Sequence, residues 1–419
     1  MPPLVFLSWK SLLNRRFTAL LTVCAIALSI ALLLAVERVR TDARQSFTNT
    51  ISGTDLIVGA RSGAIQLLLY SVFHIGNATN NVSWESYRDI AGQPLVEWAV
   101  PISLGDTHRG YRVMGTTADY FRHFRYARER SLEFASGEAF GDVFEAVIGG
   151  EVARALGYEI GDPIVVAHGA GEVSFVMHDD KPFTVSGILK RTGTPVDRTV
   201  HVSLEGIEAI HLGWEQGMPP PDQVSAQDAR DMGLTPNEIT AFLLALKSRI
   251  TVFKLQRAIN DYKAEPLLAI IPGVALQQLW DLMGVAERAL LIISAFVIAI
   301  VLVGMLAMIL SSLNERRREM AILRSVGARP AHVFGLLASE AALLAASGLV
   351  LGVALFYLLL FAGQPFIEDR FGLSISITMP SSRELSMLAG VFVGGVLMGL
   401  LPAYRAYRYS LSDGLSMRI

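Results

Sequence analysis

The chain has 419 residues, of which 52% are hydrophobic and 18% are charged, and its formal net charge is −2. Its mean hydropathy of +0.43 is too high for an ordinary soluble enzyme. The near-neutral charge also provides no basic excess for binding nucleic acid. We therefore expect an integral membrane protein without a nucleic-acid partner.

Four apolar segments approach the length of about 20 residues that crosses a hydrocarbon core of roughly 30 Å. We predict these spans at residues 17–36, 289–310, 336–362 and 385–401. Lys10, Arg15 and Arg16 precede the first segment, as they would in a secretory signal. The apolar run is too long for a signal, however, and no small-residue cleavage site follows it. We therefore expect a retained helix.

Basic residues flank the spans unevenly, and this pattern predicts the orientation. Arginines outnumber acids in the N-terminal segment, in the short loop after the second span and in the C-terminal tail. Four spans place these three segments on one side, so we expect a multi-pass protein of the bacterial inner membrane with both termini in the cytoplasm. The expected domains are an N-terminus and first helix at 1–36, a periplasmic or extracellular domain at 37–288, and a permease domain at 289–419 with a cytoplasmic loop at 313–332.

The region between the first two spans has the patterning of a mixed α and β domain. Its first part predicts a strand at 55–60, a helix at 83–92 capped by Ser83, and two strands at 96–117 that turn at Gly105 and Asp106. Within 145–167, the pattern predicts a strand, a helix that ends at Gly157, and a second strand. Strands at 181–189 and 198–204 and a helix at 205–214 follow. The last part predicts a strand at 239–248, a helix at 251–262 and a strand at 267–273.

The order of these elements predicts two lobes. A β-α-β unit lies at each end of the region, and a strand-rich insert separates them. We expect the first and last pieces to form one lobe and residues 134–203 to form the other.

We find no catalytic or metal-binding constellation in the sequence. Seven of the eight histidines lie between the first two spans, but none are paired at the spacing of helical metal ligands. His178, Asp179 and Asp180 are adjacent, which fits a metal site, although a solvated turn is the commoner explanation. Neither G-x-S-x-G nor H-E-x-x-H occurs. The single cysteine, Cys24, lies in the first span, so we expect no disulfide, no metal and no catalytic residue in the external domain.

Residues 314–328, "NERRREMAILRSVGA", lie between two apolar runs. Arginines at this position serve as a positive-inside anchor. An anchor needs no apolar stripe, yet Met320, Leu323 and Val326 repeat at helical spacing while Arg317 and Arg324 occupy other faces. The pattern predicts a helix at the membrane surface that offers one side to a partner. A glycine at 327 would then allow a sharp turn into the next span.

The block "NERRREMAILRSVGARPAHVFGLLASEA" resembles the cytoplasmic loop of ABC-transporter permeases of the macrolide-exporter, lipoprotein-release and cell-division type, the MacB/FtsX superfamily. The segments "YRVMGTTADYFRHF", "AVIGGEVARALGYEIGDPIVV" and "FTVSGILKRTGTPVDRTVHVSL" are similar to that family's two-lobed periplasmic domain. The ending "PAYRAYRYSLSDGL" resembles its C-terminal tail, with an altered end. The resemblance implies a membrane α-helical fold of four transmembrane helices, with a large mixed α+β domain between helices 1 and 2.

In that family the cytoplasmic loop docks into a groove on an ATPase subunit. The resemblance therefore implies a set of ATPase-coupling residues in this chain: Glu315, Arg317, Glu319, Met320, Leu323, Arg324, Gly327 and Ala328.

No phosphate loop of the form G-x-x-x-x-G-K-[ST] occurs in the sequence, and no Gly-Lys dipeptide occurs either. We therefore expect a stand-alone permease that is not an enzyme, holds no cofactor, and works with a separate cytoplasmic ATPase dimer that binds ATP and Mg²⁺. The other expected partners are membrane lipids, a second copy or a paralogue of the chain, and a periplasmic adaptor or lipoprotein.

Glycines in the last two spans form small-x-x-x-small pairs that allow helices to approach closely. These helix-packing candidates are Gly348 with Gly352, Gly390 with Gly394, and Gly395 with Gly399. Glu340 is the only acid well inside a predicted span, and it either has a function or reaches water at the nearby cytoplasmic face. No row of polar residues follows the spans, so we do not expect an aqueous pathway.

Two functions remain open from the sequence. In the first, ATP-driven closure moves the external domains and exports or extracts a lipoprotein, peptide, antibiotic or similar amphiphile. In the second, the same motion regulates an envelope enzyme and nothing is transported. We favour transport because the two-lobed external domain resembles the exporters more than the smaller domain of the cell-division branch.

Overall fold

The computed structural model describes residues 3–127, 129–168, 179–212, 224–315, 325, 327–371 and 377–408. The chain divides into two compact units. We call them the helical unit (Met1–Asp42, Gly284–Arg370 and Ile375–Ile419) and the α/β unit (Ala43–Met283 and Phe371–Ser374).

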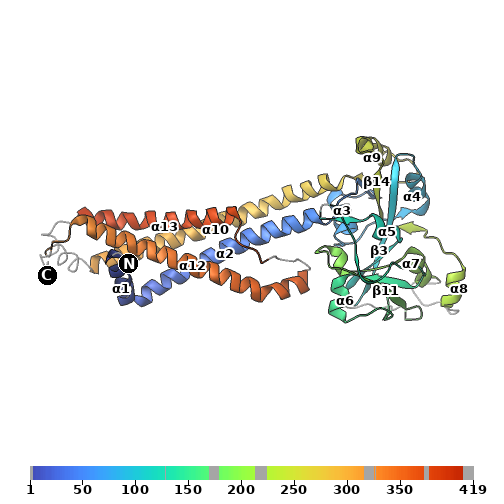
Figure 1. Ribbon diagram of the computed structural model, residues 1–419. Coiled ribbons are helices and arrows are strands. Elements are labelled where there is room, and N and C mark those ends of the chain that lie inside the picture. The colour runs from blue at the N-terminus through green and yellow to red at the C-terminus, as the bar shows by residue number, and fades with distance from the viewer. Residues whose placement is uncertain are drawn as a thin grey trace. The chain divides into compact units, whose positions relative to one another are not determined.

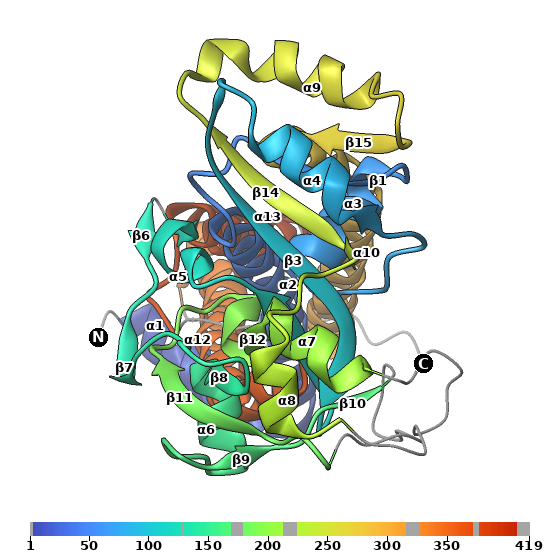
Figure 2. The same cartoon turned by 90° about the vertical axis from the view of Figure 1, so that its right-hand side faces the viewer.

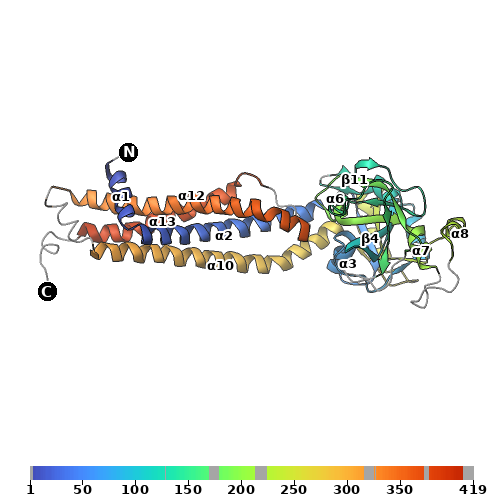
Figure 3. The same ribbon diagram turned by 90° about the horizontal axis from the view of Figure 1, so that it is seen from below.

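Four long helices form the helical unit and run side by side (Figures 1 and 3): α2 (Arg16–Asn49), α10 (Pro272–Glu315), α12 (Pro330–Phe371) and α13 (Ser382–Arg408). Each contains an apolar stretch long enough to cross a membrane, within Arg16–Asp42, Pro272–Ala307, Ala331–Gln364 and Ser382–Tyr404. The four predicted spans are confirmed as membrane-length helices.

A further helix, α1 (Pro3–Asn14), precedes the first span and was not predicted. The Ser8 hydroxyl is buried and donates a hydrogen bond to the Leu336 carbonyl at 3.2 Å. This contact packs α1 against α12. Only one turn residue, Arg15, separates α1 from α2, so no cap signal in the sequence marks the end of α1.

The α/β unit contains an 11-stranded mixed sheet with the strand order β15-β1-β14-β3-β4-β12-β8-β11-β7, in which β10 also pairs with β3 and β9 with β11. Its strands are β1 (Leu56–Ala60), β3 (Val96–His108), β4 (Tyr111–Thr116), β7 (Phe134–Gly137), β8 (Glu145–Ile148), β9 (Pro163–Ile164), β10 (Ala167–His168), β11 (Phe183–Leu189), β12 (Thr199–Ser203), β14 (Ala241–Leu246) and β15 (Leu267–Ile270). Two short ladders pair β2 (Val82–Ser83) with β13 (Glu238–Ile239), and β5 (Arg125–Tyr126) with β6 (Arg130–Ser131).

One strand, β3, belongs to both halves of the sheet. Its residues 96–102 pair with β14, which lies beside β3 in Figure 2. Its residues 103–108 pair with β4. The first and last segments of the unit, β1, β14 and β15, make one half, as predicted. The other half begins at β4, earlier in the chain than the predicted start at Phe134.

The turn between β3 and β4 was predicted at Gly105 and Asp106, and this prediction is wrong. The turn is formed by Arg109 and Gly110, whose φ angles are 46° and 84°. Positive φ at both central residues is the pattern of a type I′ turn, which matches the twist of the strands that it joins. Gly105 instead lies inside β3, where the pairing with β4 shifts its register.

Helices cover the sheet of the α/β unit. They are α3 (Ala64–Val72), α4 (Trp84–Ala91), α5 (Asp119–His123), α6 (Gly150–Leu156), α7 (Leu204–His211), α8 (Ala226–Asp231) and α9 (Val252–Asn260), with 3₁₀ turns at Pro195–Arg198 and Arg249–Thr251. The predicted cap of α4 is confirmed, because the Ser83 hydroxyl accepts a hydrogen bond from the Ser86 N–H. Gly157 ends α6 with φ 71°, also as predicted. The apolar α3 was missed because its sequence, "AIQLLLYSV", has no polar face.

Two histidines lie in the core of the α/β unit. His201, on β12, is fully buried against the Tyr120 and Phe121 rings, and its Nε2 atom has no hydrogen-bond partner. Burial lowers the pKa of His201 to about 3. His74 is half-buried and lies within hydrogen-bonding distance of the Thr199 hydroxyl, at 2.9 Å. Burial, with a contribution from the Arg112 charge, lowers the pKa of His74 to about 4.

We expect acid to destabilise this unit because of these lowered pKa values. The unfolded state takes up protons below its ordinary pKa of about 6.5, whereas the folded state keeps both imidazoles neutral, so stability is present above pH 6.5 and is lost as the pH falls. Each histidine contributes a loss of about 1.4 kcal/mol per pH unit. Thermal unfolding of the detergent-purified chain between pH 7 and pH 4 should show this slope, and His201→Gln should make it shallower. An unchanged slope in His201→Gln would contradict the assignment.

Candidate functional site

The predicted coupling residues lie around the junction of α10 and α12. Glu315 is the last residue of α10, and Gly327 and Ala328 lie just before α12 begins at Pro330. Gly327 has φ 102°, a conformation that residues with a side chain rarely adopt, and it is exposed. It therefore provides the backbone for the turn into the next span. The remaining members of the set lie outside the described residues: Arg317, Glu319, Met320, Leu323 and Arg324.

Two of the predicted glycine pairs lie at close helix contacts in the helical unit. A Cβ atom added at Gly348 would lie 2.5 Å from a methyl carbon of Ile26, and one added at Gly352 would lie 2.8 Å from the Ala27 carbonyl oxygen, both on α2. α12 and α2 therefore touch through these glycines.

The second close contact joins α13 to α12. A Cβ atom added at Gly395 would lie 2.9 Å from the Ala345 Cβ, and one added at Gly399 would collide with the Ala341 Cβ. The third pair differs. Gly394 faces the Leu302 side chain on α10 at 3.3 Å, whereas Gly390 has open space around it.

Glu340 lies on α12 and is only 4% exposed. The sequence left open whether this carboxylate reaches water at the membrane face. Its burial within the helical unit favours the alternative, a charge held inside the protein. Ionisable groups in such positions are costly and are usually functional.

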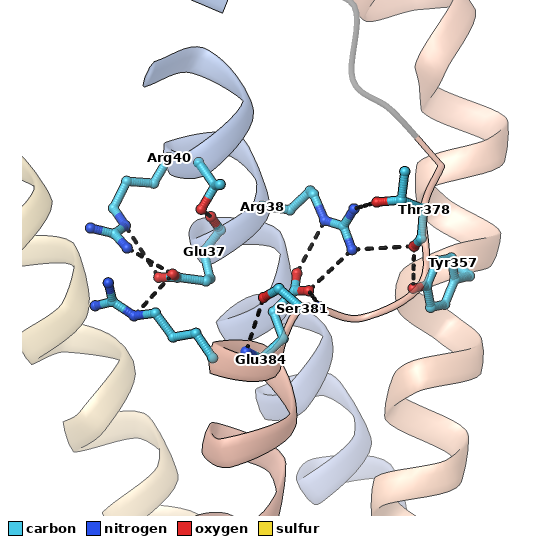
Figure 4. Close-up of polar contacts among 9 residues, drawn as sticks. Glu37, Arg38, Arg40, Tyr357, Thr378, Ser381 and Glu384 are labelled. Atoms are coloured by element: carbon cyan, nitrogen blue, oxygen red, sulfur yellow. Dashed lines mark hydrogen bonds and ion pairs between the residues drawn. The ribbon is translucent and has the colours of Figure 1, made fainter. Parts of the chain in front are cut away.

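A group of charged and polar side chains from different helices of the helical unit forms a network of hydrogen bonds and ion pairs that the sequence did not predict (Figure 4). We call it the Arg38 network. Its members come from the second half of α2, from within α10, from the start of α13, and from α12 and the segment between α12 and α13: Glu37, Arg38, Arg40, Glu287, Tyr357, Thr378, Ser381, Arg383 and Glu384.

Arg38 and Glu384 form the centre of the network. The guanidinium donates through Nε and one terminal nitrogen to the two carboxylate oxygens, at 3.1 and 3.2 Å, and the side chains are 6% and 3% exposed. The other guanidinium nitrogen donates to the Thr378 hydroxyl at 2.6 Å. Such paired bonds fix the geometry of both partners as well as contributing energy. They attach the start of α13, and the segment before it, to α2.

Glu384 also caps its own helix. Its carboxylate accepts a hydrogen bond from the Ser381 N–H at 2.6 Å, and its N–H donates to the Ser381 hydroxyl at 3.2 Å. This reciprocal pair is a capping box, for which the sequence "SSRE" is a signature. The same carboxylate therefore closes the cap of α13 and accepts the two bonds from Arg38.

Glu37 anchors a second part of the network (Figure 4). Its carboxylate accepts from Arg40 at 2.7 Å and from Arg383 of α13 at 3.1 Å. Arg40 also lies 3.6 Å from Glu287 of α10, so this part links α2 to both α13 and α10. Tyr357 of α12 donates to the Thr378 carbonyl at 2.8 Å and brings α12 into the same network.

One sequence signal could have indicated this site. Glu37, Arg38 and Arg40 crowd the end of an apolar span, and a capping-box motif opens the last span. By the positive-inside rule, charged residues next to a span indicate only its orientation. Whether such a residue is buried depends on which face of its helix meets the neighbouring helices, and the rule does not describe helix faces.

The predicted metal candidate is only partly described. His178 lies outside the described residues, and the Asp180 carboxylate pairs with the buried Lys181 ammonium at 2.7 Å. Within the part of the chain that the structure describes, no three histidine, cysteine or acidic side chains lie close enough to hold a metal ion.

Two family models match the chain. Residues 19–262 match the MacB-like periplasmic core domain, and residues 291–411 match the FtsX-like permease C-terminal domain. The first of these models alone spans more than half of the chain.

Curated relatives include the macrolide export ATP-binding/permease protein MacB of Nitrobacter winogradskyi, which is 23% identical over 94% of this chain and 57% of its own length. The pyoverdine export ATP-binding/permease protein PvdT of Pseudomonas syringae pv. tomato is 23% identical over 78% of this chain and 47% of its own length. The chain thus spans about half the length of these relatives. Among solved structures, the periplasmic region of MacB from Actinobacillus actinomycetemcomitans has 11% identity and a TM-score of 0.34, over 55% of this chain and 94% of that one.

Proposed function

The chain belongs to the MacB/FtsX superfamily of ABC-transporter permeases, and from this premise we propose that it couples ATP hydrolysis by a partner ATPase to movement of its extracytoplasmic α/β domain. That movement exports or extracts an amphiphilic substrate such as a lipoprotein, a peptide or an antibiotic. The protein works in the bacterial inner membrane with both termini in the cytoplasm.

One observation carries this proposal: the chain passes between its two units inside unbroken helices. α2 has 34 residues and α10 has 44, whereas about 20 residues suffice to cross a membrane. α2 contains the boundary after Asp42, and α10 contains the boundary after Met283. A helix that continues without a break transmits a rotation or tilt along its length, so movement in the membrane reaches the extracytoplasmic domain.

The interior of the spans supports transport on the outer side of the membrane rather than through a channel. Among the described residues of the four spans, the buried polar side chains outside the Arg38 network are Ser29, Ser294 and Glu340. An aqueous pathway needs a longer series of polar groups than this. The α12–α2 and α13–α12 contacts are instead closed by the glycines described above.

Affinity purification of the tagged chain from its native host should recover an ABC ATPase, together with ATP hydrolysis. Mass spectrometry of the medium and envelope, with and without a hydrolysis-deficient ATPase, distinguishes the two candidate functions. A lipoprotein, peptide or amphiphile that stops leaving the membrane supports transport. An altered wall-hydrolase activity with unchanged export supports the signalling alternative instead.

We also expect two permease copies in each complex, in contact through α10. Ile293, Phe296, Ile300 and Val303 of α10 are exposed and repeat at spacings of three and four residues, the pattern of a helix–helix seam. In a Cys24→Ala background, Phe296→Cys should cross-link two copies in native membranes. Phe361→Cys on α12, which is 74% exposed, is the matched control and should not. Equal cross-linking of both variants would contradict this interface.

A further inference from the structure

The Arg38 network lies where the two kinds of span meet. α2 continues into the α/β unit as far as Asn49, and α10 begins in that unit at Pro272. By contrast, only the last residue of α12, Phe371, belongs to the α/β unit, and α13 lies wholly in the helical unit. The expected coupling block lies between α10 and α12, and the chain does not join either α12 or α13 directly to α2. Movement of α12 and α13 therefore reaches α2 through side-chain contacts. Within the Arg38 network, the described polar contacts between α13 and α2 are those of Arg38 and Glu37.

The central pair is built to stay closed. Both charges of Arg38 and Glu384 are buried, and both carboxylate oxygens accept hydrogen bonds from the guanidinium. Removing one partner of a buried pair leaves the other charge without compensation, which is strongly unfavourable. Opening the pair would likewise leave two buried charges without compensation, so the pair is unsuited to act as a switch.

The outer pairs have the opposite character. Arg383 is 54% exposed, although its partner Glu37 is only 3% exposed, and Arg40 lies 3.6 Å from Glu287, beyond hydrogen-bonding distance. An ion pair with one solvated charge, or with its atoms this far apart, contributes less than a buried, doubly hydrogen-bonded pair. The network therefore combines one fixed pair between α2 and α13 with weaker links that can open, including the link between α2 and α10.

We propose that Arg38 is a positioning residue for energy coupling: its buried pair with Glu384 fastens α13 to α2 throughout the cycle, so that the movement of α12 and α13 is passed to the helix that continues into the α/β domain. This inference rests on the proposed function. To that function it adds a specific joint between α2 and α13, formed by Arg38 and Glu384.

The test uses the full chain with its co-purified ATPase in lipid nanodiscs. In a Cys24→Ala background, spin labels at Gln227→Cys in the α/β unit and Ser386→Cys on α13 report the distance between these positions, with and without ATP and vanadate. Arg38→Gln should retain ATP hydrolysis and ATPase binding while the ATP-linked distance change is lost. A residue needed only for folding would instead lower the yield and hydrolysis together.

Three further variants separate the pair from its surroundings. Glu384→Gln keeps the capping box, which accepts glutamine, but removes the charge, and it should cause the same loss even where Arg38→Gln fails to insert. Arg38→Lys keeps the charge and should restore part of the distance change. Lys190→Gln, which breaks an exposed ion pair with Glu133 in the α/β unit, is the matched control and should behave like the wild type.

The outcomes also separate this inference from the proposed function. If Arg38→Gln or Glu384→Gln shows the same ATP-linked distance change as the wild type, the proposed joint is wrong and the proposed function is unaffected. An equal loss in Lys190→Gln also overturns the joint. A wild-type complex without ATP hydrolysis, or without any ATP-linked distance change, overturns the proposed function and the joint together.

Discussion

Replacing Glu319 with lysine is expected to weaken ATPase binding by well over tenfold. The predicted surface helix offers its charged side to the partner, and removal of one member of a partly desolvated charge pair costs roughly 2–5 kcal/mol. Lysine also adds repulsion from any basic residue that the glutamate meets. Arg324→Glu should have a comparable effect through loss of a cation.

The alternative role of this block, a topological anchor only, predicts the opposite sign. Glu319→Lys would add positive charge on the cytoplasmic side and would be harmless or favourable. Co-purification of the ATPase with each variant measures binding, and a C-terminal reporter verifies insertion. Asp413→Lys in the predicted cytoplasmic tail is the matched charge reversal and should not affect binding. A Glu319→Lys variant that inserts normally and retains active ATPase would refute the coupling role.

The second large effect is expected from Gly352→Leu. An added Cβ would lie 2.8 Å from the Ala27 carbonyl oxygen of α2 and 2.7 Å from the Ile30 Cβ. A backbone oxygen cannot rotate away as a flexible side chain can, so α12 must move off α2. We expect a loss of about 3 kcal/mol, the upper part of the usual range for overpacking, and a fall in the yield of folded protein.

Gly390→Leu is the matched control, because open space surrounds Gly390. Both variants add the same apolar side chain to a membrane helix, so their hydrophobicity is equal. Unfolding in mixed micelles, followed by circular dichroism, should show a lower midpoint for Gly352→Leu alone. Equal midpoints in the two variants would show that the α12–α2 contact is not tight in the membrane.

Much of the fold could be predicted because its signals are local. The four spans follow from the length of apolar runs, and Gly157 follows from the preference of helix ends for a left-handed glycine. The β3–β4 turn was misplaced because two positions offered turn residues. The strands continue pairing past Gly105, and this pairing decides in favour of Arg109 and Gly110.

The candidate site was predictable only in part. The glycine pairs indicated close packing, but the sequence did not show that Gly352 meets α2, or that Gly390 lies in open space. Glu340 was noticed as an intramembrane acid, and only its burial distinguished the two explanations. Such differences depend on which face of a helix turns toward its neighbours.

By itself, the sequence determined the class of the protein, the number of its spans and the family to which it belongs, because hydropathy, turn residues and motifs act over short distances. The tertiary structure alone decided that β3 serves both halves of the sheet and that Arg38 meets Glu384 across 346 residues of chain. Several acids and arginines flank the spans, and nothing in their spacing along the chain selects one pair. The selection comes from helix packing, which brings the capped start of α13 to the second half of α2 and excludes water from the two charges that meet there.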